Sequence, residues 1–440
     1  MAKLQVDNVV PLDKEIPEKL APKFEDTGFV NGQIKNLNTA ENLACMLDFL
    51  GVEAKRNKMN LDQEIHKRNK EPLAHPDVVR SYLISYAARF DLPKSVIDDH
   101  LSAIMHHNEY HPVKDWLSTG EWDGVQRVNQ VIDTLNLKEK ELAQTVLTHF
   151  FVGCVASLME RSFNSKLVPV LQGDQSYMKT AWIGRLFNVP NRETGSFLEG
   201  AALNPEHKDS TVRAIKHWAV ELAELEQTTK RGQGELKAFL TSPVDVVRLA
   251  YGRTETRKPR QTNFIATVNG TGFLKDETGS TRFAVLEMES KADIERLNGL
   301  LGWEWKQQAK LVKPELLKQF WLEVKTLYDN GHKWFLSDEV SLKFSNVIND
   351  KHTDKGGFYQ TIREKYVSPP NTTELDQYMS WVTASRICEI ENIPKQQVVQ
   401  IGKALNKLVK EGLLKKKKAS GVFHYHIYDS ANHIYDLTKP

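Results

Sequence analysis

The most constraining feature of this chain is a short apolar run that ends near a glycine and is followed by a Lys-Thr pair. Leu167–Leu171 predicts a buried parallel strand, and a helix is predicted over Ala181–Phe187. In such a strand–loop–helix unit, backbone N–H groups surround phosphate oxygens, while a lysine and a hydroxyl contact phosphate and Mg²⁺. The spacing of the glycine, lysine and hydroxyl is met here. The predicted nucleotide-binding residues are Gly173, Asp174, Gln175, Ser176, Tyr177, Met178, Lys179 and Thr180.

One position departs from the phosphate-loop pattern, because Met178 stands where a second glycine is usual. A non-glycine residue there must avoid a positive φ or accept strain. The alternative interpretation is therefore an ordinary strand–loop–helix connection with an incidental Lys-Thr pair. The segments that follow in the chain favour the phosphate loop.

Two further apolar runs are followed by polar side chains suited to nucleotide chemistry. Trp218–Leu222 contains Glu221 and is followed by Glu224, and the strand predicted at Asn263–Val268 is followed by Asn269. Carboxylates hold Mg²⁺ and orient an attacking water, and an amide can bind that water or the γ-phosphate. A solvent-exposed acidic strand end is the alternative. We expect Thr180 and Glu221 to hold Mg²⁺, with Glu221, Glu224 and Asn269 as catalytic candidates.

A lone arginine, Arg282, precedes a last apolar run at Phe283–Met288. Arginine stabilises transition-state charge in phosphoryl transfer, either in cis or from a neighbouring subunit. Strands that alternate with helices predict an α/β P-loop NTPase domain with a mainly parallel sheet. The predicted divisions are an irregular arm (1–38), a helical N-terminal domain (39–135), the ATPase domain (136–330) and a C-terminal region (331–440) with a winged helix at about 378–430.

The charge balance hides local basic segments, because 59 Lys and Arg face 57 Asp and Glu for a net charge of +2. This excludes a uniformly basic protein but permits basic patches. One such patch is a predicted hairpin with one strand at Val246–Tyr251 and its return at Thr256–Gln261. Its basic side chains suit sequence-independent phosphate contacts. The alternatives are a solvated hairpin, or arginines that reach the nucleotide of a neighbouring subunit. The predicted DNA-binding residues here are Arg248, Arg253, Arg257, Lys258 and Arg260.

The C-terminal region predicts a second basic patch. Helices at Val382–Glu391 and Lys395–Glu411 are followed by two strands, which is the order of a winged helix. A recognition helix in the major groove with a basic wing on the backbone is a common DNA-binding geometry. The alternative is a winged helix that contacts only protein. The predicted DNA-binding residues are Lys403, Lys407, Lys415, Lys416, Lys417 and Lys418.

Taken together, these motifs resemble the virulence-associated protein E family of phage and mobile-element replication proteins, which are similar to superfamily-three helicases of the AAA+ class. Besides the site residues above, the resemblance rests on Tyr110-His111-Pro112-Val113, Trp122-Asp123-Gly124-Val125-Gln126-Arg127, Lys237-Ala238-Phe239-Leu240, Tyr251-Gly252-Arg253, Pro259-Arg260, Phe273-Leu274-Lys275-Asp276-Glu277-Thr278-Gly279 and Arg282-Phe283. It covers about residues 40–345.

The resemblance implies an ATP- and Mg²⁺-dependent DNA helicase that forms a hexameric ring, with single-stranded DNA in the pore and a separate primase as a possible partner. Lys179 matches the phosphate lysine, Thr180 the Mg²⁺ hydroxyl, Asn269 the sensor asparagine and Arg282 the arginine finger. The competing hypothesis is a replication initiator that binds nucleotide weakly or not at all and binds origin DNA through its winged helix. Met178 favours that second hypothesis.

Other features exclude several classes. Three scattered cysteines without a CxxC pair argue against a disulfide scaffold and a zinc site. Neither an apolar leader nor an 18-residue apolar run is seen, so we expect a protein of the bacterial host cytoplasm without membrane association. A primase carboxylate cluster and a nuclease motif are also missing from the sequence.

Overall fold

The computed structural model divides the chain into two compact units, which are described separately. Unit 1 comprises residues 1–270 and 281–346, and unit 2 comprises residues 271–280 and 347–440. Within them the structure describes residues 21–67, 76–189, 195–223, 225, 230–247, 255–274, 282–343, 352, 357–367 and 379–428.

A five-stranded sheet forms the centre of unit 1, with the strand order β12-β6-β11-β8-β7. All neighbouring strands in it are parallel, which confirms the predicted α/β fold with a mainly parallel sheet. Four of the strands are buried almost throughout, as expected where helices cover both faces of a sheet. The strands are β6 (Val168–Gln172), β7 (Phe197–Ala201), β8 (Ala219–Leu222), β11 (Asn263–Val268) and β12 (Phe283–Glu287).

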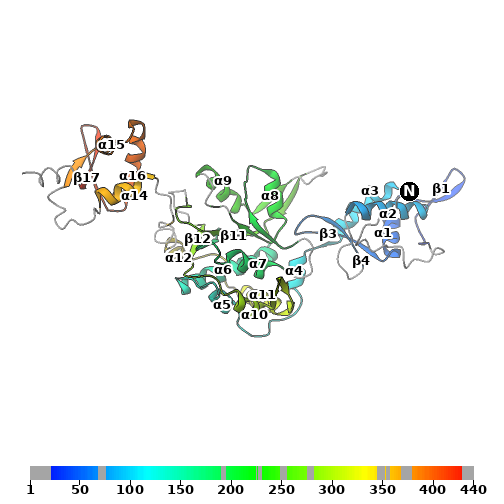
Figure 1. The fold of residues 1–440 in the computed structure, drawn as a ribbon. Helices are drawn as coiled ribbons and strands as arrows, with labels where there is room; N and C mark the ends of the chain where they lie inside the picture. The colour runs from blue at the N-terminus through cyan, green and yellow to red at the C-terminus, as the bar shows by residue number, and fades with distance from the viewer. Residues whose placement is uncertain are drawn as a thin grey trace, which may run out of the picture. The chain divides into compact units, whose positions relative to one another are not determined.

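Helices cover this sheet, and aromatic side chains fill the space between them. Trp218 and Trp321 meet with ring centroids 4.5 Å apart, and Phe187 packs against both. Figure 1 shows α6, α7 and α11 on one side of strands β11 and β12. The helices are α6 (Lys140–Met159), α7 (Lys179–Phe187), α8 (Lys208–Ile215), α9 (Lys230–Leu240), α10 (Ile294–Leu301), α11 (Pro314–Asp329) and α12 (Asp338–Lys343).

Helix α6 is the one helix among the described residues that is long and apolar enough to cross a membrane. However, 72% of its most apolar window is buried inside the protein, where it packs on α11 and on the sheet. Burial on this scale is what a core helix of a globular fold shows.

Two antiparallel hairpins extend unit 1. They are β9 (Val244–Val247) with β10 (Thr256–Pro259), and β13 (Trp303–Lys306) with β14 (Gln308–Leu311). The second hairpin begins at Gly302, which ends α10 with a φ of +80°. A Cβ atom at Gly302 would lie 2.2 Å from the carbonyl oxygen of Lys313, so only glycine fits this close approach.

The N-terminal region contains several helices and, in addition, a small sheet that the sequence did not indicate. Its three-stranded sheet has the order β4-β3-β5, and α1, α2 and α3 pack with it. Thr39 caps α1 by accepting a hydrogen bond from the Asn42 amide. The elements are α1 (Ala40–Phe49), β3 (Val52–Asn57), β4 (Gln63–Lys67), α2 (Pro76–Arg89), α3 (Ser95–His107), β5 (Glu109–Tyr110), α4 (Pro112–Leu117) and α5 (Val128–Asp133).

The predicted irregular arm also contains regular structure in its described part. Strands β1 (Thr27–Val30) and β2 (Gln33–Asn36) form a hairpin across Asn31 and Gly32. Both turn residues have positive φ, at 50° and 79°. An Asn-Gly pair is the preferred two-residue hairpin turn, and it is the sequence signal for this element.

Unit 2 contains a three-helix core against a three-stranded antiparallel sheet of order β15-β17-β16. The predicted succession of helix, helix and two strands is present, and β15 is an additional strand. The turn between β16 and β17 is Ser420-Gly421, where both residues have positive φ. The elements are α14 (Gly357–Tyr366), β15 (Met379–Val382), α15 (Ala384–Ile390), η5 (Lys395–Gln397), α16 (Val398–Lys410), β16 (Lys415–Ala419) and β17 (Val422–Tyr428).

Candidate functional site

The predicted phosphate loop lies between β6 and α7, at the carboxyl end of a central strand. A Cβ atom at Gly173 would lie 2.8 Å from the Tyr177 ring and 3.1 Å from Met288, so the first glycine is needed for packing. Ser176 and Met178 both take the left-handed conformation, with φ of 70° and 62°. Met178 therefore does not avoid a positive φ. It adopts the backbone conformation that glycine would favour, and the loop is strained at this position.

Lys179 is buried beneath this loop and holds its shape. Its Nζ donates to the carbonyl oxygens of Gly173 at 2.6 Å and Asp174 at 2.9 Å, and to Asn269 Oδ1 at 3.0 Å. Asn269 follows β11, the strand beside β6 in the sheet. The structure therefore brings together the two residues that the sequence assigned to phosphate and to sensing, although 90 positions separate them.

Glu221 is fully buried on β8 and receives three hydrogen bonds. Its Oε1 accepts from the hydroxyls of Thr180 at 2.5 Å and Thr267 at 2.8 Å, and its Oε2 accepts from the Gly200 amide at 3.1 Å. Glu221 thus lies beside the predicted Mg²⁺ hydroxyl, as expected. Thr267 is a member of this cluster that the sequence analysis missed, and its place on the strand before Asn269 was the available signal.

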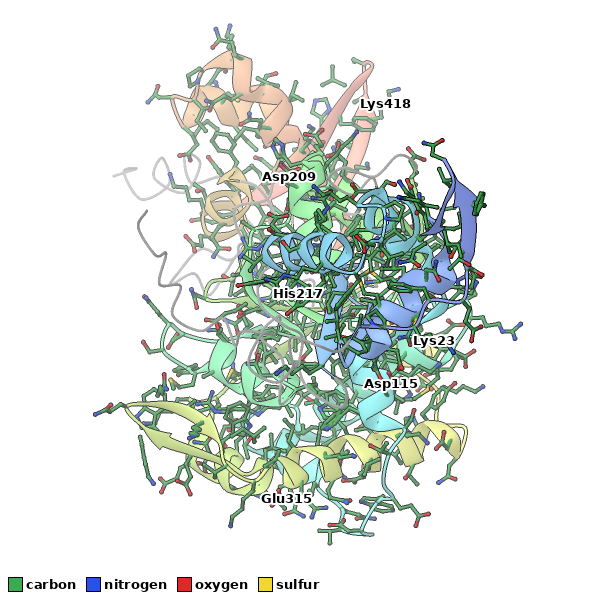
Figure 2. The ribbon with its side chains drawn as sticks, turned by 90° about the vertical axis from the view of Figure 1, so that its right-hand side faces the viewer. Lys23, Asp115, Asp209, His217, Glu315 and Lys418 are labelled. Carbon is green, nitrogen blue, oxygen red and sulfur yellow. The ribbon has the colours of Figure 1, made fainter. Side chains whose placement is uncertain are left out.

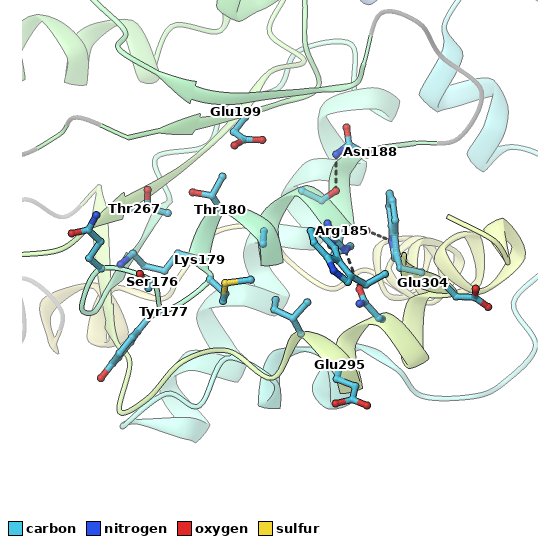
Figure 3. Close-up of a pocket in the computed structure, with 18 of the residues that line it drawn as sticks. Ser176, Tyr177, Lys179, Thr180, Arg185, Asn188, Glu199, Thr267, Glu295 and Glu304 are labelled. Carbon is cyan, nitrogen blue, oxygen red and sulfur yellow. Dashed lines mark hydrogen bonds between the residues drawn. The ribbon is translucent and has the colours of Figure 1, made fainter. Parts of the chain in front are cut away.

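A cavity of about 1140 Å³ extends from the phosphate loop along the open face of α7 to the β13–β14 hairpin (Figure 3). Thr180, Thr267 and Asn269 line its loop end, whereas Arg185, Asn298 and Trp303 line its far end. The sequence analysis did not identify this far end. Arg185 donates from Nε to Asn298 Oδ1 at 2.9 Å and lies 5.0 Å from the Trp303 ring centroid. Burial lowers the pKa of Arg185.

Arg282 lies away from the phosphate loop of its own chain. It precedes Phe283, which pairs with Val168 at the start of β6, whereas the loop follows Gln172 at the end of β6. Five residues of strand span about 16 Å, so the two sites lie at opposite edges of the sheet. Arg282 is therefore too far from the loop of its own chain to contact a phosphate bound there. Glu224 lies outside the described residues.

The base of the basic hairpin corrects two of the DNA-binding assignments, because Lys258 and Arg260 are both only 3% exposed. Lys258 Nζ donates to the carbonyl oxygens of Met59, at 2.5 Å, and Ile215. Arg260 Nη2 donates to Asp245 Oδ1 at 2.6 Å. Strand alternation points every second side chain inward, and sequence alone did not show which basic residues those would be.

The rest of this hairpin differs in part from the prediction. Its first strand is β9, which begins at Val244, and Arg257 is exposed on the returning strand β10. Arg248 and Arg253 lie outside the described residues. Arg257 therefore remains a candidate for DNA contact at the surface.

Burial shifts the pKa of each group in the cluster at the hairpin base. It lowers the pKa of Lys258 to about 8 and lowers that of Arg260, and it raises the pKa of Asp245. Burial, together with the Lys258 charge, lowers the pKa of the nearby His111 to about 3, so this imidazole stays neutral. The cluster joins the hairpin to the N-terminal region, where Lys216 also pairs with Asp62 at 2.8 Å.

In unit 2 the predicted basic residues lie at the surface. Lys403 is exposed on α16, Lys407 is half-buried, and all four lysines of β16 are exposed. Lys418 lies near the tip of the β16–β17 hairpin (Figure 2).

Comparison with known proteins places this site in a family. The virulence-associated protein E-like domain model matches residues 117–353, which is more than half of the 440-residue chain. The chain belongs to the virulence-associated protein E-like family. The matched range includes the phosphate loop, Glu221, Asn269 and Arg282, and this confirms the resemblance seen in the sequence.

The matching solved structures share little sequence with this chain. The apo structure of the NrS-1 C-terminal region has a TM-score of 0.46 and 11% identity, and covers 88% of this chain and 98% of that chain. An A-form apo structure of the same region has a TM-score of 0.44 and 13% identity with the same coverage. No curated protein matched the chain.

The virulence-associated protein E-like domain thus contains the whole cluster built around Lys179 and Glu221, together with the hairpin base. The basic strand β16 lies outside residues 117–353. Any DNA contact made by β16 is therefore an addition to the matched domain.

Proposed function

We propose that this protein is an ATP-dependent DNA helicase in the replication of a phage or mobile genetic element, and that it works as a ring in the bacterial host cytoplasm. The observation that carries the proposal is the convergence of Lys179, Thr180, Glu221 and Asn269 at the carboxyl ends of three neighbouring strands. Membership of the virulence-associated protein E-like family supports the replication role.

The donor set fits a nucleotide with Mg²⁺. Lys179 Nζ, now donating to loop carbonyl oxygens, is placed to donate to phosphate, and the left-handed Ser176 and Met178 shape the loop. The Thr180 hydroxyl, fixed by a buried carboxylate, is the hard oxygen ligand that Mg²⁺ prefers. When bound, Mg²⁺ would neutralise charge that develops on the phosphates.

Each residue then has a separate task. Glu221 orients Thr180 and has both oxygens engaged, so it is a positioning residue, which leaves Glu224 as the candidate for activating water. Asn269 Oδ1 holds Lys179 and would detect a phosphate that takes over this amine. Arg282, at the far edge of the sheet, would reach the nucleotide of the next subunit, which requires a head-to-tail ring.

DNA contact is assigned to two surfaces. Arg257, with Arg248 and Arg253, would follow the backbone of a single strand in the ring pore. In unit 2, α16 with Lys403 and Lys407 and the wing lysines 415–418 would bind duplex DNA as a winged helix.

The test is hydrolysis of ATP with and without single-stranded DNA, combined with strand displacement and a mass measurement of the assembly. Lys179→Ala should abolish hydrolysis and unwinding without changing the far-UV circular dichroism spectrum. Lys166→Ala is the matched control, because Lys166 is an exposed lysine that precedes β6 at the opposite edge of the sheet. Unwinding by Lys179→Ala at the wild-type rate would refute the assigned site.

The second candidate is a replication initiator that binds origin DNA and hydrolyses little or no ATP. The presence of Ser176 and Met178 at positive-φ positions where glycine is usual favours it, because these departures from the phosphate-loop pattern bear on hydrolysis more than on nucleotide binding. Measurable turnover of ATP stimulated by DNA would eliminate this candidate. Duplex binding without any turnover would support it.

A further inference from the structure

The three-stranded sheet of unit 2 has one face on the core and an opposite, outer face that is partly exposed. Val382 and Tyr425 are paired across β15 and β17 and are buried against the helices. Because successive side chains alternate, the neighbouring pair of Trp381 and His426 points to the opposite, outer face. Lys415 is paired with His426 from the other side, so it shares this outer face.

The outer face combines an aromatic surface with cations. The rings of Trp381 and His426 lie 4.8 Å apart between centroids with an interplanar angle of 31°. Lys417 Nζ lies 4.2 Å from the centroid of the Trp381 ring, which is still 37% exposed. Lys417 is paired with His424, which also belongs to this face. We call Trp381, His424, His426, Lys415 and Lys417 the outer aromatic face.

Positive charge predominates in the described residues that carry this face. Residues 379–428 contain nine Lys and Arg but only three Glu, and strands β15, β16 and β17 contain no acid at all. The three glutamates are engaged elsewhere. Glu389 pairs with Arg386, Glu391 pairs with Lys365, and Glu411 accepts from Tyr359.

An exposed tryptophan among lysines matches the chemistry of an unpaired nucleotide, whose base presents a π-face and whose phosphate carries a negative charge. The bases of a duplex are already stacked on each other and do not offer their faces. The ammonium of an exposed lysine exchanges partners easily, so Lys417 can move from the indole to a phosphate while a base takes its place on the ring.

We propose that the outer aromatic face binds single-stranded nucleic acid, with one base stacked on Trp381 and with Lys415 and Lys417 on adjacent phosphates. This surface is distinct from α16 and from the phosphate loop, and it shares Lys415 and Lys417 with the wing to which duplex binding is assigned. The proposal stands on unit 2 alone and does not need ATP hydrolysis, so it and the proposed helicase activity can fail independently.

The experiment measures the affinity of the full-length protein, without nucleotide, for a labelled 15-residue oligothymidylate and for a chain of equal length that lacks bases. Trp381→Ala should weaken oligothymidylate binding by roughly 5- to 100-fold, the range seen for loss of a stacking aromatic side chain. It should leave the affinity for the base-free chain unchanged. Trp381→Phe, which keeps a ring, should restore most of the loss.

Two further variants separate stacking from charge. Lys415→Ala with Lys417→Ala should weaken binding of both probes and reduce the slope of log affinity against log salt by about 1.4, which corresponds to two single-strand phosphates. Phe29→Ala is the matched control, because Phe29 is 78% exposed on β1 in unit 1 and should leave both affinities unchanged.

The location of the bound single strand on the protein is tested by photocrosslinking with an oligothymidylate that carries 4-thiothymidine. Crosslinked peptides should include residues 379–428, and crosslinks confined to unit 1 would overturn the proposal. Equal losses on both probes for Trp381→Ala, or a loss of duplex binding only, would also overturn it. If Trp381→Ala fails to fold, wild-type affinity for oligothymidylate that does not exceed affinity for the base-free chain decides against stacking.

Discussion

The buried pair at the base of the basic hairpin gives a quantitative prediction about stability. Asp245 and Arg260 lie 2.6 Å apart with side chains only 2% and 3% exposed, and Lys258 is buried beside them. Two unit charges about 4 Å apart attract by about 4 kcal/mol at an effective dielectric constant of 20. Desolvation costs several kcal/mol for each ion. The pair as a whole should therefore contribute little to the free energy of unfolding.

Removing one partner has a different consequence. Asp245→Leu leaves Arg260 and Lys258 buried without an anion, which should lower the free energy of unfolding of unit 1 by about 3–5 kcal/mol. Arg260→Met leaves Asp245 as the uncompensated charge and should cost a similar amount. Replacing both residues with Leu and Met leaves Lys258 as the one cation of this cluster without its anion. The double variant should therefore be less destabilised than Asp245→Leu, without returning fully to the wild type.

The assay is differential scanning calorimetry at pH 7, in which each single variant should lower the midpoint of the unit 1 transition by roughly 4–7 °C. Asp98→Ala is the control, since its ion pair with Arg80 is half exposed and should matter by less than about 1 kcal/mol. If the double variant loses as much as the two single variants added together, the argument from uncompensated buried charge is wrong.

Three further predictions concern other parts of unit 1. In a urea titration, Gly302→Ala should lower the free energy of unfolding by more than about 2 kcal/mol, because its Cβ would meet the Lys313 carbonyl. Gly299 lies inside α10 with open space around it, so Gly299→Ala should raise the free energy of unfolding by about 0.5–1 kcal/mol in the same titration. The Lys258 pKa of about 8 lies below its ordinary value of 10.5, so the unfolded chain binds more protons between these values. Stability should rise with pH in that window by about 3 kcal/mol, and Lys258→Met should abolish the rise in pH-dependent unfolding curves. Met178→Gly should change the free energy of unfolding by no more than about 1 kcal/mol. Met178→Val places a β-branched residue at a positive φ and should lower the thermal midpoint. Equal midpoints for the two variants would contradict the left-handed conformation of the loop.

The sequence was sufficient for the features that depend on chain order. Apolar strands followed by Lys179, Glu221 and Asn269 predicted a parallel sheet and a common edge, because parallel strands end at the same side. Thr267 and the far end of the cavity were missed, because a threonine in a strand and a tryptophan after a helix have no distinctive spacing.

Local charge was a less reliable guide than chain order. A run of basic residues predicted a surface, yet Lys258 and Arg260 point inward, and this depends on the register of β10 against Asp245. The N-terminal sheet was missed for a related reason. In Val52–Asn57 the inward residues are small or polar and alternate with charged ones, so the strand lacked a strong apolar signal beside helices with clear periodicity.

The two acceptors of Lys258 are backbone carbonyl oxygens, and this has a consequence for how the site varies among relatives. A carbonyl imposes no requirement on the side chain that carries it, so the hydrogen bonds to Lys258 do not restrict residues 59 and 215, whose side chains are restricted by their burial in the core. The hydrogen bond from Lys258 to the Met59 carbonyl depends on the path of the backbone through residues 57–62. A relative with a shorter turn would lose one of the two carbonyl acceptors, and a lysine aligned with position 258 would then be buried with fewer partners. Conservation of this lysine should therefore follow the length of that turn and not the residues that compose it.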